Sequence, residues 1–163
     1  KCYEVPVGFK YISAKMEQTD ALIGGESSGG LTVRGHIHGK DGVYAGTLLV
    51  EMISVIGKPL SEVLHDIHKR FGSYVMDEFD CHMTNQRKEE LKHILYEEKK
   101  IPEFDMEIDR VSYLDGCKVY FKNGGWIICR FSGTEPVLRI FCEMTCLEEA
   151  TRVSRIFRDF LEL

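Results

Sequence analysis

Apolar residues follow two different periodicities in the first part of the chain. They recur at helical spacing from Ala45 to Ile56, and a second helical stripe runs from Pro59 to Phe71. Residues 2–7 and 21–23 form short runs that predict strands, with a short helix around Met16 between them. This order of elements predicts an α/β unit, although its sheet has too few strands to stand alone.

Strand patterns dominate the second part of the chain. An extended stretch over 74–83 and a polar helix over about 84–99 come first. Asp115-Gly116 and Asn123-Gly124 are hairpin turn signals, and Thr145-x-x-Glu148 is a capping box that opens a last amphipathic helix. The four expected strands are Asp105–Tyr113, Cys117–Phe121, Trp126–Phe131 and Val137–Met144.

The change of pattern near Gly72 predicts two domains with little linker between them. Residues 1–72 form the first, and residues 73–163 form the second, a complete α+β unit with a four-stranded sheet and two helices. The chain begins without Met and enters an extended pattern at once, so we expect that it belongs to a larger protein.

Composition excludes several classes of function. Apolar residues make up 44% of the chain and charged residues 29%, as in an ordinary globular protein, and no apolar run approaches the length of a membrane span. The net charge of −5 argues against a nucleic-acid-binding surface. Three of the six cysteines (Cys117, Cys129 and Cys142) lie in strand-like apolar runs, which predicts buried reduced thiols and a cytoplasmic protein.

The segment from Arg130 to Arg139, Arg-Phe-Ser-Gly-Thr-Glu-Pro-Val-Leu-Arg, collects the groups that bind a phosphate. Arg130 offers a planar set of charged donors, Ser132 and Thr134 offer hydroxyls, and Gly133 lets backbone N–H groups approach an oxyanion. Side chains alternate between the two faces of a strand, and the sequence does not decide on which face of the following strand the Arg139 side chain lies. An ordinary hairpin loop rich in small polar residues is the alternative interpretation.

This segment resembles the phosphate-binding loop in the last domain of the α-D-phosphohexomutases, the phosphoglucomutase/phosphomannomutase family. The resemblance implies that Arg130, Ser132, Gly133 and Thr134 hold the non-reacting phosphate of a hexose phosphate, with Arg139 in support.

A glycine-rich loop, Gly24-Gly-Glu-Ser-Ser-Gly-Gly30, follows the strand expected at 21–23. It fits neither nucleotide-binding fingerprint, and its residue types suit either sugar hydroxyls or a plain flexible loop. Gly25 to Gly29 resembles the sugar-recognition loop of the third phosphohexomutase domain, which implies that Glu26 and Ser28 bind ring hydroxyls. Many members place His after the last glycine, where this chain has Gly30, so an acid/base role of that His does not transfer.

Two further segments resemble substrate-contacting parts of the family. Lys40-Asp-Gly resembles a segment of glucomutase-like members, where the lysine lies near the reacting hydroxyl; Lys40 would steer phosphate or act as a general base. Gly8-Phe9-Lys10 resembles the segment ahead of the sugar loop, which implies substrate contacts of Gly8 and Lys10. The alternatives are a solvated lysine at a helix start and a surface lysine. His36 and His38, like His65 and His68, have no third ligand at zinc spacing.

The resemblance implies the C-terminal portion of an enzyme that interconverts hexose 1- and 6-phosphates through a phosphoserine and a hexose 1,6-bisphosphate. The phosphoserine and the Mg²⁺ site would lie in N-terminal domains of the same protein, so residues 1–163 alone are expected to be inactive. The expected partners are a hexose phosphate and those domains, without nucleic acid or membrane. Two alternatives are a stand-alone sugar-phosphate-binding module and a phosphoglucosamine mutase.

Overall fold

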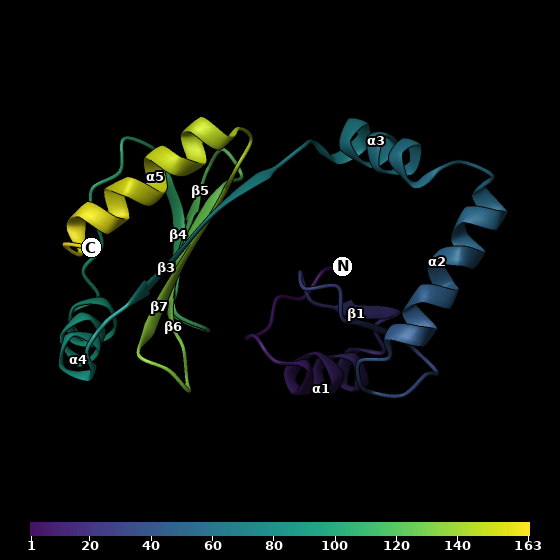
Figure 1. Ribbon diagram of the computed structural model, residues 1–163, viewed down its shortest axis with the longest axis horizontal. Coiled ribbons are helices and arrows are strands. Elements are labelled where there is room, and N and C mark those ends of the chain that lie inside the picture. The colour runs from purple at the N-terminus through teal and green to yellow at the C-terminus, as the bar shows by residue number, and fades with distance from the viewer. The chain divides into compact units, whose positions relative to one another are not determined.

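The computed structural model describes all residues from 1 to 163 and divides them into two compact units (Figure 1). Unit 1 is Lys1–Phe71 and unit 2 is Gly72–Leu163. The boundary in the structure therefore lies one residue before the boundary placed after Gly72 by the change of sequence pattern.

Unit 1 contains three helices and a two-stranded sheet. The two strands pair in an antiparallel hairpin, with Gly24 opposite Thr32. The elements are α1 (Phe9–Thr19), β1 (Ile23–Gly25), β2 (Leu31–Val33), α2 (Gly42–Ile56) and α3 (Leu60–Phe71).

The strand expected over residues 2–7 is wrong. Residues 1–6 have no regular structure, and α1 begins soon afterwards at Phe9. An extended segment becomes a strand only by pairing its backbone with a neighbour, and in unit 1 β1 pairs with β2 alone. The buried strand expected over 21–23 starts only at Ile23, which is exposed, as is Leu22.

The helix ends in unit 1 follow local chemistry. Asp41 caps α2 by accepting a hydrogen bond from the backbone N–H of Tyr44 at 2.9 Å. Gly57 ends the same helix in the left-handed conformation at φ 68°, as a glycine after an apolar stripe predicts. Gly8 precedes α1 at φ 128°, a conformation that L side chains rarely adopt.

Unit 1 has very little buried apolar surface. Ile12 and Met16 of α1 are its only buried hydrophobic residues, and they pack where Gly24 leaves room, since a Cβ on Gly24 would lie 2.5 Å from Met16 Sδ. Neither α2 nor α3 has a buried residue. No single helix here is both long and apolar enough to cross a membrane. The pair α2 and α3 meets the length and composition criteria together but is bent by 82°.

Unit 2 is an antiparallel sheet of five strands in the order β3-β7-β6-β5-β4. The sheet has one strand more than expected because β3 pairs with β7 along its whole length, from Val75 opposite Met144 to His82 opposite Val137. The strands are β3 (Val75–His82), β4 (Ile108–Ser112), β5 (Cys117–Phe121), β6 (Trp126–Phe131) and β7 (Val137–Met144). The α+β prediction for this unit is confirmed.

The helices of unit 2 differ from their sequence patterns in two places. The single helix expected over 84–99 is α4 (Asn85–Lys92) followed by a π-helical turn, η1 (His93–Glu97). The capping box at Thr145 is wrong: α5 (Leu147–Phe160) begins after Cys146 and has no side-chain cap.

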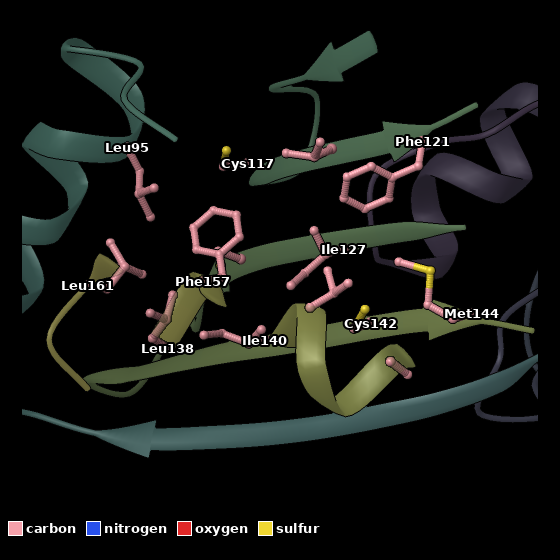
Figure 2. Close-up of a cluster of buried hydrophobic side chains, with 14 of the residues drawn as sticks. Leu95, Cys117, Phe121, Ile127, Leu138, Ile140, Cys142, Met144, Phe157 and Leu161 are labelled. Atoms are coloured by element: carbon pink, nitrogen blue, oxygen red, sulfur yellow. The ribbon is translucent and has the colours of Figure 1, made fainter. Parts of the chain in front are cut away.

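Helix α5 covers one face of the sheet and closes the core of unit 2 (Figures 1 and 2). Ala150, Val153 and Phe157 of α5 share one buried cluster with alternate residues of three strands, as the period of two in a strand requires. These strand residues are Cys117, Val119, Phe121, Ile127, Cys129, Leu138, Ile140, Cys142 and Met144. Arg130 and Arg139 alternate with them and therefore lie on the other face.

The three buried cysteines confirm the prediction of buried, unpaired thiols. Burial raises the pKa of Cys117 to about 11, that of Cys142 to about 12, and that of Cys129 well above its usual value. They are core residues of unit 2 and poor nucleophiles at neutral pH.

Candidate functional site: an anion loop and a sugar loop

The residues 132–136 between β6 and β7 form the loop that we call the anion loop. Its ends are closed by a hydrogen bond from the Ser132 N–H to the Val137 carbonyl at 2.8 Å. Ser132 Oγ lies 3.4 Å from the backbone N of Thr134 and 3.3 Å from that of Glu135. Gly133 at the tip is exposed, and a Cβ there would meet nothing within 4 Å, so no crowding inside the chain requires a glycine. A ligand that approaches the backbone would require one.

Three hydrogen bonds from the segment after β3, donated by Met83 and Lys88, hold the back of the anion loop. The Met83 N–H donates to the Pro136 carbonyl at 3.0 Å. The Lys88 ammonium donates to the carbonyls of Ser132 at 2.8 Å and Glu135 at 3.0 Å. Sequence reasoning missed Lys88, because a lysine on a polar helix is usually solvated.

The two arginines predicted for this site lie next to each other. Arg130 on β6 and Arg139 on β7 are directly opposite in the strand register. Like charges in this position repel each other, and a carboxylate flanks each guanidinium: Asp115 at 3.5 Å from Arg130 and Asp80 at 3.7 Å from Arg139.

These arginines keep donor capacity for a further anion. The side chains of Arg130 and Arg139 are only 20% and 38% exposed, so solvent screens them incompletely. Arg139 Nε is shielded from solvent and has no hydrogen-bond partner, since the oxygen of Asp80 is too far away. Two adjacent guanidiniums that are partly exposed are suited to bind a phosphate.

Tyr96 of η1 supports the strand that leads into the anion loop. Its ring packs edge-on against Phe131, with centroids 5.7 Å apart, and its hydroxyl hydrogen-bonds the Phe131 backbone. Burial raises the pKa of Tyr96 to about 12, so the phenol stays neutral at physiological pH. The π-helical turn therefore contributes an uncharged support beside the site.

The second candidate loop, which we call the sugar loop, is the hairpin turn Glu26–Gly30 between β1 and β2. The Glu26 N–H donates to the Gly30 carbonyl at 2.8 Å, and the Gly29 N–H donates to the Glu26 carbonyl at 3.0 Å. Gly29 has φ +90°, which explains a glycine at this position. Ser28 is exposed at the tip of the turn.

Lys40 and Glu26, predicted separately, meet in an ion pair. Lys40 Nζ lies 2.5 Å from Glu26 Oε2, and the Glu26 side chain is 15% exposed against 53% for Lys40. The aliphatic part of Lys40 lies over Gly30, where a Cβ would be 2.9 Å from Lys40 Cδ. Gly30, at the position where the family often has His, therefore leaves the space that Lys40 occupies.

The start of α1 lies beside this pair, whereas Lys10 points elsewhere. Lys40 Nζ is 5.9 Å from the centre of the Phe9 ring, which places the predicted Gly8 segment next to the sugar loop. Lys10 Nζ lies over the ring of Tyr11 at 4.8 Å and pairs with no carboxylate. The structure thus brings Glu26, Lys40 and the start of α1 together but gives Lys10 no contact with them.

Polar contacts fix the segment that carries Lys40. Asp41, as the cap of α2, also lies 3.0 Å from His36 Nε2, and the pKa of this carboxyl is lowered, mainly by the Tyr44 N–H and then by His36. His38 pairs with Glu17 at 2.7 Å. The two histidines thus bind different carboxylates and form no joint site, and no three metal-ligating side chains cluster anywhere in the chain.

Models of two consecutive domains of one family match the chain. The model described as phosphoglucomutase/phosphomannomutase, alpha/beta/alpha domain III, matches residues 1–71. The model of the C-terminal domain of the same family matches residues 83–160. The two matches together cover most of the chain, which therefore belongs to the phosphoglucomutase/phosphomannomutase family.

Relatives over the whole chain carry the same family names. A phosphoglucomutase/phosphomannomutase of Thermococcus kodakarensis is 30% identical over all of this chain and 32% of its own length. A probable phosphoglucosamine mutase of Methanosphaera stadtmanae is 30% identical over 96% of this chain and 33% of its own length. The chain thus spans about a third of the length of these relatives.

A solved structure supports the same fold. The crystal structure of a protein described as a phosphomannomutase from Thermus thermophilus matches with a TM-score of 0.71 and 25% identity. The match covers 97% of this chain and 30% of that one.

Proposed function

We propose that the chain supplies sugar and phosphate binding to a phosphohexomutase that interconverts hexose 1-phosphates and hexose 6-phosphates. The observation that carries this proposal is the pair of adjacent arginines, Arg130 and Arg139, beside an anion loop whose exposed tip is Gly133. A site of this kind binds an anion through charge-assisted hydrogen bonds and backbone N–H groups together.

Each predicted residue has a role in this proposal. Arg130, with Ser132, Gly133 and Thr134 of the anion loop, holds the non-reacting phosphate, and Arg139 adds charge. Glu26 and Ser28 bind ring hydroxyls. One carboxylate oxygen of Glu26 pairs with Lys40, and the remaining lone pairs of this carboxylate can accept hydrogen bonds from sugar hydroxyls.

Lys40 and the start of α1 complete the sugar side. Lys40 would hold the Glu26 carboxylate and, on substrate binding, exchange this partner for a phosphate or a reacting hydroxyl. Gly8 would approach the ligand with its backbone beside the sugar loop. For Lys10 the proposed substrate contact requires its side chain to leave the Tyr11 ring.

The remaining chemistry of such an enzyme is proposed for other domains of the same protein. Mg²⁺ has no set of ligands among residues 1–163, so no step proposed here runs through a metal. The phosphoserine that would donate phosphate likewise belongs to another domain, and its reaction with the substrate would form the hexose 1,6-bisphosphate. We propose that the complete protein acts in the cytoplasm.

An Arg130 variant tests the proposal. A charge-assisted hydrogen bond contributes about 1.5–3 kcal/mol, so Arg130→Ala should weaken binding of glucose 6-phosphate to the 163-residue chain by roughly tenfold to a hundredfold. The measurement is an NMR titration with glucose 6-phosphate. Arg155→Ala removes the same charge from an exposed position on α5 and should leave the affinity unchanged. Equal affinities of the two variants would remove Arg130 from the site.

An amino sugar is the second candidate substrate, because one of the two matched relatives above is a probable phosphoglucosamine mutase. The Glu26 carboxylate would attract an ammonium on the sugar ring more strongly than a hydroxyl. Titration of glucosamine 6-phosphate beside glucose 6-phosphate distinguishes the two: tighter binding of the amino sugar that is lost in Glu26→Gln would favour the glucosamine enzyme.

A further inference from the structure

We propose that Lys88 is a positioning residue of the anion loop: it fixes the Ser132–Gly133 peptide so that the Gly133 N–H faces the bound phosphate. This inference rests on the proposed phosphate-binding function and deepens it. Lys88 lies on α4, more than forty residues before the loop in the sequence, and its ammonium donates to the carbonyls of Ser132 and Glu135 at 2.8 and 3.0 Å.

The orientation follows from the geometry of the peptide bond. A trans peptide points its C=O and its N–H in opposite directions. Because the Ser132 carbonyl points at Lys88, the N–H of the same peptide, which belongs to Gly133, points to the opposite side. This N–H makes no hydrogen bond within the chain and lies at the exposed tip of the loop. Lys88 thereby orients a free donor for an anion.

The charge of Lys88 is also available to the loop. Lys92 on the same helix pairs with Glu89 at 2.7 Å, whereas Lys88 forms no ion pair. Its positive charge is therefore uncompensated by a carboxylate and lies directly behind two carbonyls of the anion loop. Backbone carbonyls also accept hydrogen bonds from neutral donors, and the one carboxylate of the loop, that of Glu135, forms no ion pair with Lys88. An anion in front of the loop would make use of this charge.

The Glu135 contact has a different consequence. The peptide that follows Glu135 ends in Pro136, which has no N–H, so this second bond orients no further donor. It anchors the other end of the loop, together with the Met83 N–H on the Pro136 carbonyl. The Ser132–Gly133 peptide is thus held between two fixed points and cannot rotate without breaking the Lys88 contact.

The test is a titration of the 163-residue chain with inorganic phosphate, followed by the backbone amide signals of the anion loop. In the unmodified chain the Gly133 amide should shift on phosphate binding. In Lys88→Met we expect this shift to shrink and the Kd for phosphate to rise about threefold to tenfold. The reason is that only about a third to a tenth of the molecules would then have the loop in the conformation that binds phosphate. Lys88→Arg, which keeps the charge and the donors, should restore most of the affinity.

Lys92→Met is the matched control, since it removes a half-buried lysine of the same helix that does not contact the anion loop, and it should change neither value. Equal Kd values for Lys88→Met and Lys92→Met would overturn the proposal. So would an affinity loss in Lys88→Met with an unchanged Gly133 response, because Lys88 would then act by charge alone. If Lys88→Met does not fold, Lys88→Gln takes its place and the same outcomes apply. If Arg130→Ala also leaves phosphate binding unchanged, it is the phosphate site itself that fails, and not only the role of Lys88.

Discussion

The two units hold their candidate loops by different means. In unit 2 the anion loop joins β6 and β7, two central strands of a sheet whose core is closed by Phe157 and its neighbours. In unit 1 the sugar loop joins two strands of three residues, and only Ile12 and Met16 are buried hydrophobic residues nearby. The anion loop is therefore supported by a hydrophobic core as well as by polar contacts, whereas the sugar loop depends mainly on polar contacts.

The polar contacts of unit 1 are specific but individually weak. Thr32 is fully buried and donates to the Ile37 carbonyl at 2.6 Å, and Ser13 donates to the His38 carbonyl at 3.0 Å. Together with the Asp41 cap they fix the path of the chain up to Lys40. Hydrogen bonds of this kind contribute about 1 kcal/mol each, whereas a buried core side chain contributes about 1.5–3 kcal/mol. Polar contacts thus position Glu26 and Lys40 without a large hydrophobic core, and we expect unit 1 to be the less stable of the two units.

The largest expected effect of this difference is on independent folding. We expect residues 72–163 to unfold cooperatively in urea when produced alone, as a closed core of this size allows. Residues 1–71 should show no cooperative transition, because burial of three residues cannot offset the conformational entropy that 71 residues lose on folding. Circular dichroism and the dispersion of amide NMR signals measure both.

The whole chain is the control for this dissection. Its single cooperative transition should have the same midpoint as residues 72–163 alone. A cooperative transition for residues 1–71, or a lower midpoint for unit 2 without unit 1, would contradict the proposed division of stability.

The sequence predicted unit 2 better than unit 1. Apolar runs bounded by turn signals gave the bounds of β5, β6 and β7, and the turns at Gly116 and Gly124, both at positive φ, made the hairpins identifiable. Alternation is visible where one face of a strand is buried. The segment 2–7 has alternating residue types but no partner strand. Whether a segment finds a partner strand depends on the rest of the fold and cannot be read from the segment itself.

Candidate site residues were predicted by residue type, but their contacts were not. Glu26 and Lys40 were identified separately, and their ion pair depends on Gly30, whose role is to leave space. Lys88 was missed because it binds residues far away in the sequence and belongs to no motif. Asp115 was recognised only as part of a turn signal and not as the partner of Arg130. Long-range polar contacts of this kind depend on the fold, and the periodicity of apolar residues along the sequence does not predict them.

The next effect compares one apolar side chain from each unit. Ile140 on β7 is fully buried, so Ile140→Ala should lower the free energy of unfolding by about 2–5 kcal/mol through lost burial and a cavity. Val50 on α2 is 64% exposed, and Val50→Ala should change the free energy of unfolding by less than about 0.5 kcal/mol. Urea unfolding of the whole chain measures both. Similar losses for the two variants would show that α2 is buried in solution.

The smallest expected effect concerns the polar contact that holds Glu26. Gly30→Ala places a Cβ 2.9 Å from Lys40 Cδ and should displace the lysine from Glu26, whereas Gly39→Ala meets nothing within 4 Å and is the matched control. The Lys40 side chain is half exposed, so its ion pair contributes at most about 1 kcal/mol, and the Kd for glucose 6-phosphate should rise no more than about fivefold. Lys40→Ala should cause at least this loss, because it also removes the proposed contact of Lys40 with the substrate. The double variant should lose no more than Lys40→Ala alone, because the Gly30 variant acts only through Lys40. Additive losses would mean that Gly30 and Lys40 contribute to binding independently and that the ion pair does not position Glu26.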